Sequence, residues 1–340
     1  MPRSSWAPAL DGALADQARA AAGEVGEILA AARVEPADAA GVALFWAYHP
    51  GGEPRREAAI DALYAAIEEL DTPALHGGLV GAAWALAHVA DGVDEALAQV
   101  DELLVDDLPV SHDLIDGLAG LVVYWLARPR SPARDAGLAR IVAVLEDTRE
   151  GATWRTPPEL LAPEQRERHP GGVLDCGLAH GAPGPIAMLA RLDERVVDPP
   201  LAARARELAA EATRWLLAQR LAMAGASAFP AISGGGPART AWCYGDPGAA
   251  MALAWTARGE AEAIARRAAH RDPEDRGVTD ASFCHGALGL AHLWNRWFQA
   301  TGDEQFRGAL RDWIVRGLVM PRPAAPGLLG GAAGIGLVLL

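Results

Sequence analysis

A paired-glycine step that opens an apolar segment recurs along this 340-residue chain, and it constrains the fold more than any other feature. In each copy two residues separate the glycines, and a stretch rich in Ala, Leu and Val follows. Glycines at such points favour crowded helix starts, because a Cβ would clash there. A degenerate copy, which lacks the first glycine, aligns on Gly41. The six complete copies begin at Gly78, Gly117, Gly181, Gly245, Gly286 and Gly331.

The spacing of the repeat predicts a pair of helices for each copy. The second glycines stand at positions 41, 81, 120, 184, 248, 289 and 334, so most steps are near 40 residues and two are 64. A period near 40 fits two helices with their turns. The charged segments between the copies have an apolar stripe at i, i+3 and i+4, which is typical of one-sided helices. These outer helices are predicted at about 14–33, 53–70, 93–105, 132–148, 201–220, 258–270 and 303–318.

This alternation predicts an all-α fold, an α/α toroid of seven inner and seven outer helices around a central cavity. The composition agrees, because 51% of the residues are hydrophobic and Ala and Leu favour helices. We expect a single domain over residues 1–340. Two insertions rich in Pro and Gly, at about 149–176 and 222–240, should form loops at the rim that carries the glycine turns. The last inner helix reaches Leu340 after about two turns, so we expect it to be truncated relative to the last helix of a complete toroid.

Charge and hydropathy narrow the class of partner. A net charge of −14 disfavours a nucleic-acid partner and is compatible with a basic peptide. No run of 18 uncharged apolar residues occurs, which predicts no membrane span. The N-terminal segment does not resemble a signal peptide, and three cysteines are too few for a disulfide framework. We therefore expect a cytoplasmic protein.

Two neighbouring glycine turns carry the residues of a candidate metal site. Cys243 and the pair Cys284–His285 stand just before the first glycines of successive copies. Toroid symmetry places the starts of adjacent inner helices side by side, so these three side chains should meet. Two thiolates and an imidazole suit one Zn²⁺ ion, and three protein ligands leave its fourth position open, as in catalytic sites. A buried cysteine can instead be a small apolar residue, which is our interpretation of Cys176.

A histidine and an aspartate at the same rim are candidates for proton transfer. His180 begins a further inner helix and could act as a general acid or a general base near neutral pH. The alternative is an ordinary hydrogen-bonded turn histidine. Asp113 opens the third inner helix, where a carboxylate is commonly an N-cap, and Asp116 competes for that position.

The turns around these residues resemble those of the lanthionine synthetase C-like cyclases, from about residue 38 to the end of the chain. The matching segments are 113–120 (DLIDGLAG), 177–181 (GLAHG), 241–248 (AWCYGDPG), 283–289 (FCHGALG) and 327–335 (GLLGGAAGI). The resemblance implies a double ring of helices and one Zn²⁺ ion. It implies that the zinc ligands are Cys243, Cys284 and His285, and that the catalytic residues are His180, Asp113, Arg239 and Tyr244.

The resemblance also implies a function, that of a lanthipeptide cyclase. Such an enzyme adds peptide cysteine thiols to dehydroalanine or dehydrobutyrine and closes lanthionine or methyllanthionine rings, as in lantibiotic biosynthesis. Its expected partners are a dehydrated precursor peptide with a leader, a dehydratase and an exporter. Two alternatives stay open: addition of glutathione or another thiol to dehydrated protein residues, and a non-catalytic peptide-binding toroid. A fourth protein ligand such as Cys176 would close the metal site and favour the second alternative.

Overall fold

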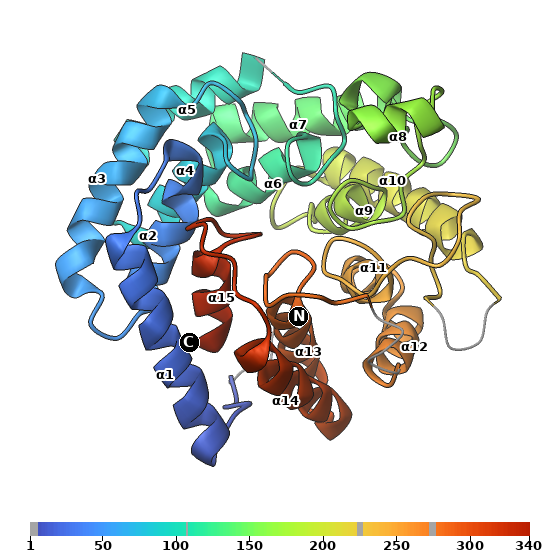
Figure 1. Cartoon of the computed structure of the whole chain (residues 1–340). Coiled ribbons are helices and arrows are strands. Elements are labelled where there is room, and N and C mark those ends of the chain that lie inside the picture. The colour runs from blue at the N-terminus through green and yellow to red at the C-terminus, as the bar shows by residue number, and fades with distance from the viewer. Residues whose placement is uncertain (1–5, 107, 223–226, 272–276) are drawn as a thin grey trace.

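The chain forms two concentric layers of helices (Figure 1). The computed structural model describes residues 6–106, 108–222, 227–271 and 277–340. The inner layer consists of α2 (Ala39–Tyr48), α4 (Leu79–Val89), α6 (Leu118–Ala127), α9 (Pro183–Leu189), α11 (Asp246–Leu253), α13 (Ala287–Thr301) and α15 (Ala332–Leu339). The outer layer consists of α1 (Gly12–Ala31), α3 (Glu53–Glu69), α5 (Asp94–Asp106), α7 (Pro132–Asp147), α10 (Pro199–Ala218), α12 (Arg258–Ala269) and α14 (Glu304–Val319). The predicted toroid, with seven helices in each layer of the described residues, is confirmed, and each outer helix lies within two residues of its expected bounds.

The inner layer closes into a ring. Each inner helix contacts the next one along the chain, and the last, α15, contacts the first, α2. The outer helix α1 covers this closing seam, because it packs against α15 and α14. Figure 1 shows the two ends of the colour scale meeting at the seam.

The two layers differ in how much of each helix is buried. In α6 the apolar side chains are buried on all sides, including Leu118, Leu121 and Trp125. In α3 only a stripe is buried, formed by Ala59, Leu63 and Ala66. A helix that is apolar all round belongs inside a protein, and a helix with one apolar stripe belongs on its surface.

The glycines allow each inner helix to start against the backbone of its own preceding loop. At the second glycine of each of the six complete copies, an added Cβ would approach the carbonyl oxygen six residues earlier. It would lie 2.1 Å from the Leu75 oxygen at Gly81 and 1.7 Å from the Phe283 oxygen at Gly289. The close neighbour is therefore the loop itself, and not the adjacent helix as the crowding argument alone would suggest.

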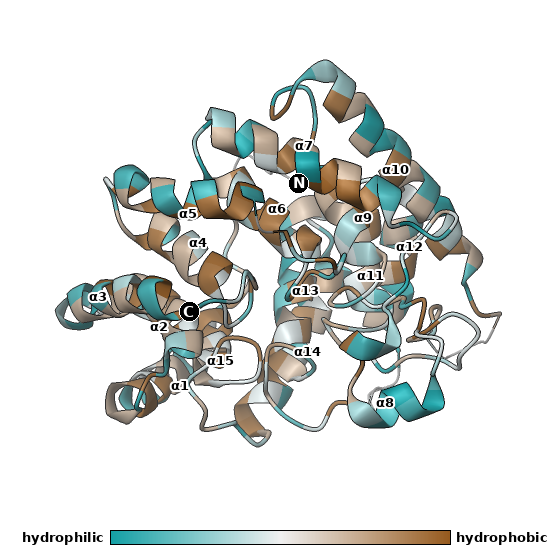
Figure 2. Cartoon of the chain, turned by 90° about the horizontal axis from the view of Figure 1, so that it is seen from above, coloured by the Kyte–Doolittle hydropathy of each residue, from teal (hydrophilic) through white to brown (hydrophobic). Residues whose placement is uncertain are grey.

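The first insertion is more ordered than the predicted loop. It contains a 3₁₀ turn, η2 (Pro158–Leu160), and a polar helix, α8 (Pro163–Arg168), which lies at the edge of the molecule in Figure 2. Isolated antiparallel bridges join Thr156 to Val173 and Asp175 to Ile232, so the two insertions lie together. Residues 223–226 of the second insertion are outside the described ranges.

A remaining 3₁₀ turn, η1 (Pro36–Asp38), precedes α2. None of the helices in the described part of the chain is both long and apolar enough to cross a lipid bilayer.

Candidate metal centre and its acid–base neighbours

Backbone hydrogen bonds tie together the loops that precede successive inner helices. In each case the accepting carbonyl belongs to the residue five positions before a second glycine, and the N···O distances are 2.8–3.3 Å. The Cys243 amide donates directly to the Cys284 carbonyl at 3.2 Å. This linkage is why two cysteines 41 residues apart in sequence lie at the same point of the rim. The accepting residues are Ile115, Ala179, Cys243, Cys284 and Leu329.

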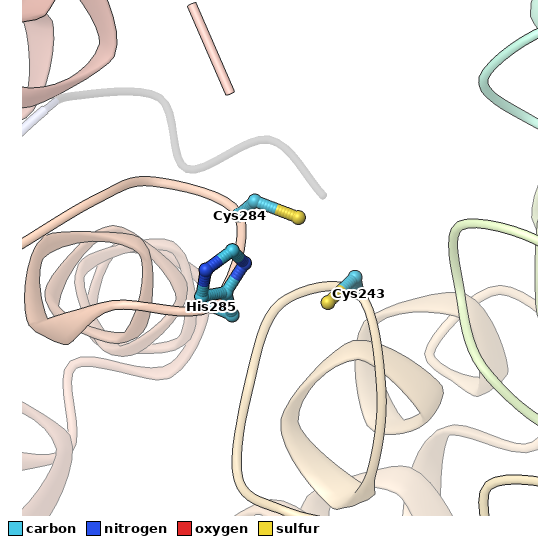
Figure 3. Close-up of side chains that lie close together, drawn as sticks. All are labelled: Cys243, Cys284 and His285. Carbon is cyan, nitrogen blue, oxygen red and sulfur yellow. The ribbon is translucent and has the colours of Figure 1, made fainter. Parts of the chain in front are cut away.

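Cys243, Cys284 and His285 come together at this rim, as the sequence predicts. One ligand atom from each residue lies within 4.8 Å of the others. Figure 3 shows Cys284 and His285 on one loop and Cys243 on the neighbouring loop, with the side chains gathered between the two. Cys243 is buried, and the other two are partly exposed.

This donor set fits Zn²⁺. Bonds of about 2.0–2.3 Å in a tetrahedral site require ligand atoms about 3.3–3.8 Å apart. The three ligand atoms, all within 4.8 Å of one another, are close to that spacing. Two sulfurs and one nitrogen match the borderline-soft character of zinc. Cys176 is fully buried and is not part of the group. Three protein donors would therefore leave one coordination position for another molecule.

The surroundings of Cys243 favour its thiolate form, whereas its contact with Cys284 raises the pKa of the Cys284 thiol. A hydrogen bond from the Cys284 thiol lowers the pKa of Cys243 to about 7, against the effect of burial, and the positive charge of Arg239 acts in the same direction. The Arg239 Nη2 atom lies 4.0 Å from the Cys243 sulfur. Behind the third residue of the group, the Asp280 carboxylate lies 3.6 Å from His285 Nε2. A carboxylate in this position orients a histidine that binds metal.

His180 and Asp113 form a direct pair. Asp113 Oδ2 contacts Nδ1 of His180, and Oδ1 accepts the backbone amides of Ile115 and Asp116. Asp113 is therefore not the N-cap of α6, which is Gly117 without a side-chain cap; one Asp113 oxygen closes the turn before the helix and the other holds the imidazole. With Nδ1 engaged, Nε2 is the atom of His180 that is available for proton transfer.

The carboxylates around His180 keep its imidazole protonated. Burial lowers the pKa of His180, but the hydrogen bond and charge of Asp113 and the charges of Asp175 and Asp116 outweigh it and raise the pKa to about 9. The side chain is 45% exposed, so solvent reaches the ring. A histidine in this state is an acid at neutral pH.

Tyr244 lies between the metal cluster and His180. Its ring centroid is 6.3 Å from that of His180, and it follows Cys243 directly in the chain. Its hydroxyl donates to Asp175 Oδ2 at 2.8 Å. Asp175 was not singled out from the sequence. The available signal was its position, nine residues before the second glycine of its copy, which is the position of Asp280 in a later copy.

A cavity of about 510 Å³ opens beside His180. The inner-helix turns contribute Asp113, His180 and Tyr244 to its wall, and α8 contributes Gln165 and Arg168 from the opposite side. The glycine-turn rim and the first insertion thus both line the cavity, and His180 is part of its wall.

Comparisons with known proteins identify the family and the fold. The sequence model of lanthionine synthetase C-like proteins matches residues 39–340. The solved structure of nisin cyclase has the same fold, with a TM-score of 0.75 and 18% sequence identity over 93% of this chain and 92% of that chain. A search of the curated proteins gives no match.

Proposed function

Because the chain belongs to the lanthionine synthetase C-like family, we propose that it is a zinc-dependent lanthipeptide cyclase. The observation that carries the proposal is the Cys243–Cys284–His285 cluster, which offers three ligand atoms to a metal ion. The His180–Asp113 pair at the same rim supplies the second requirement, a proton donor beside a cavity. A peptide-binding scaffold needs neither feature.

The reaction forms one bond to sulfur and one bond to hydrogen. Bound Zn²⁺ supplies positive charge that favours the thiolate form of a substrate cysteine. The substrate thiol releases its proton to solvent, and solvent later returns one to His180. The sulfur bonds to the β-carbon of dehydroalanine or dehydrobutyrine, and the carbon–carbon double bond is lost. Negative charge then spreads over the α-carbon and its carbonyl oxygen, and one proton on the α-carbon completes the thioether.

We assign delivery of that proton to His180. The imidazolium lines the cavity, its Nδ1 is held by Asp113, and its Nε2 carries the transferable proton. Asp113 keeps the ring in one orientation and favours the charged form. Arg239 is exposed beside Cys243 and is placed to stabilise the negative carbonyl oxygen until the proton arrives.

The substrate in this proposal is a dehydrated precursor peptide with a leader, bound in the cytoplasm. The net charge of −14 favours a peptide that carries basic residues. A separate dehydratase must prepare the substrate, because no group in the proposed mechanism removes water from Ser or Thr. An exporter is the expected consumer of the cyclised product.

Removal of two metal ligands tests the proposal. We expect Cys284→Ala with His285→Ala to reduce zinc from one ion per chain to none and to abolish ring closure, while the helical circular dichroism spectrum is kept. Cys176→Ala is the matched control, because this cysteine is buried outside the cluster, and it should keep both zinc and activity.

The product must be identified by its chemistry. Ring closure leaves the mass of the dehydrated peptide unchanged but removes a thiol that iodoacetamide can alkylate, whereas glutathione addition increases the mass. Cyclisation by a zinc-free double variant would overturn the zinc mechanism. Products that form only with added glutathione would favour thiol addition instead.

A further inference from the structure

Asp175 is a buried carboxylate that the mechanism above does not use. It is 4% exposed, and both of its oxygens have specific partners. Oδ1 accepts the Gly177 amide at 2.6 Å, and Oδ2 accepts the Tyr244 hydroxyl at 2.8 Å. A carboxylate in such a place is tolerated only when it is hydrogen-bonded. The second bond connects the loop that carries His180 to the loop that carries Cys243.

The local turn alone does not explain this connection. Asp280 occupies the same position in a later copy of the repeat and accepts the Ser282 amide at 2.7 Å, as Asp175 accepts that of Gly177. The turn is therefore complete without a tyrosine. The hydrogen bond to Tyr244 is an additional feature of the copy that carries His180.

Glycines on both sides of His180 make room for the two partners. A Cβ at Gly177 would lie 2.6 Å from the Tyr244 ring, and a Cβ at Gly181 would lie 2.3 Å from the Asp175 carbonyl oxygen and 2.7 Å from its Oδ1. Both glycines have ordinary negative φ angles, so space, and not backbone conformation, requires them. The Tyr244 ring consequently packs against the His180 turn while its hydroxyl reaches the buried carboxylate.

We propose that Asp175 is a positioning residue, which holds the Tyr244 hydroxyl and thereby keeps the first metal cysteine and His180 in register. This inference rests on the proposed cyclase function. It deepens that function by adding a residue that acts through Tyr244. Burial raises the pKa of Asp175 to about 6, so the carboxylate is ionised and able to accept above that pH.

Ring-closure kinetics test the inference through Tyr244. Because a misplacement of about 1 Å can reduce a rate about 100-fold, we expect Asp175→Ala to reduce kcat by about 10- to 100-fold and to change KM much less. Asp175→Asn keeps an acceptor oxygen and should restore part of kcat. If Asp175 acts through Tyr244, then Asp175→Ala combined with Tyr244→Phe should be no slower than the slower single variant.

A second buried pair provides the matched control. Tyr124 on α6 donates to Asp101 on α5, which is also a tyrosine–aspartate hydrogen bond but outside the site. Tyr124→Phe should leave kcat unchanged. Multiplying effects of the Asp175 and Tyr244 substitutions would overturn the inference.

A measurement without substrate separates this inference from the cyclase proposal. The chain has four tyrosines, so the Tyr244 signal in a spectrum of ¹³Cζ-labelled protein can be assigned from Tyr244→Phe. Asp175→Ala should shift that signal, and Asp175→Asn should shift it less. An unchanged signal would overturn the positioning role, whereas a wild-type protein that forms no thioether would overturn only the proposed function.

Discussion

His180 lies among three carboxylates, and this charge environment decides the direction in which it moves a proton. Asp113 contacts the ring directly, while Asp175 and Asp116 act through space. An imidazole with a pKa near 9 is already charged at neutral pH, so it can donate a proton but not accept one. The residues therefore support a general acid, a choice that was open from the sequence.

The pH dependence of ring closure follows from this assignment. We expect kcat to fall as pH rises through about 9, because His180 loses the proton that it must donate. Asp113→Asn removes the largest favourable influence and should move the fall toward the unperturbed histidine value of about 6.5. A rate that increases with pH over this range would show that His180 is a base. Steady-state kinetics between pH 6 and 10 make this measurement.

The same titration should affect folding. Because the folded pKa of His180 lies above that of the unfolded chain, its stabilising contribution is complete below about pH 6.5 and is lost as pH rises through 9.

Single residues also mark the limit of sequence reasoning. Cys243, Cys284 and His285 were predictable because two adjacent copies carry them at matching positions. The pairing of Asp113 with His180 was predicted only from the family resemblance. Spacing alone did not indicate it, because a carboxylate at a helix start is already explained as a cap. Asp175 could not be found, because its bond to Tyr244 depends on side-chain packing between copies and not on spacing.

At the scale of elements, the turn before each inner helix is the unit that carries function. In five of the six complete copies the residue after the first glycine donates its amide to the carbonyl seven positions earlier, for example Ala287 to Asp280 at 2.9 Å and Ala332 to Ala325 at 2.7 Å. These hydrogen bonds hold each such loop against the start of its own helix, an arrangement that we call winding. The position of a ligand depends on this winding.

A side chain at a second glycine should disrupt the winding. At Gly289 an added Cβ would lie 1.7 Å from the Phe283 oxygen, so Gly289→Ala must displace the loop that holds Cys284 and His285. We expect weaker zinc binding and a loss of unfolding free energy of about 1–3 kcal/mol or more. Zinc titration and urea unfolding measure the two effects.

A second glycine provides the control for this prediction. Gly23 in α1 has no heavy atom within 4 Å of an added Cβ, and Gly23→Ala should stabilise the chain by about 0.5–1 kcal/mol. Equal behaviour of the two variants would contradict the role assigned to Gly289.

The helices themselves were largely predictable, because periodicity and the glycine repeat act locally. The exception is α8, which lies in an insertion rich in Pro and charge. Arg166 bonds to the carbonyls of Pro158, Glu159 and Leu161 and so holds η2 against α8. A contact of one long side chain with three carbonyls leaves no periodic signal in the sequence.

The whole molecule depends on closure of the ring where its two ends meet. Gln299 exchanges two hydrogen bonds with the backbone of Ala7, at 2.9 and 2.7 Å, and Arg322 pairs with Glu24 at 2.8 Å. Exposed ion pairs contribute little. We therefore expect side-chain packing to contribute most of the stability at the seam. The packing is close, because a Cβ at Gly336 would lie only 2.4 Å from the Phe45 ring.

Truncation of a side chain at the seam should weaken the entire ring. Phe45 is fully buried where α15 meets α2, so Phe45→Ala is expected to cost about 3–5 kcal/mol of unfolding free energy. Val319 is 83% exposed, and Val319→Ala should change stability by less than about 0.5 kcal/mol. A similar thermal midpoint for both variants would mean that the seam carries little of the stability.

Each of the six complete copies of the glycine repeat places one residue at an equivalent position on the rim, five positions before its second glycine. Only two of these copies, which are adjacent, have cysteine at this position, and the others have histidine or an aliphatic residue. The backbone hydrogen bonds between the loops of successive copies do not depend on which side chain is present at this position. The side chain at this position can therefore change in one copy of the repeat while the ring of helices stays closed. The occupants, in chain order, are His76, Ile115, Ala179, Cys243, Cys284 and Leu329.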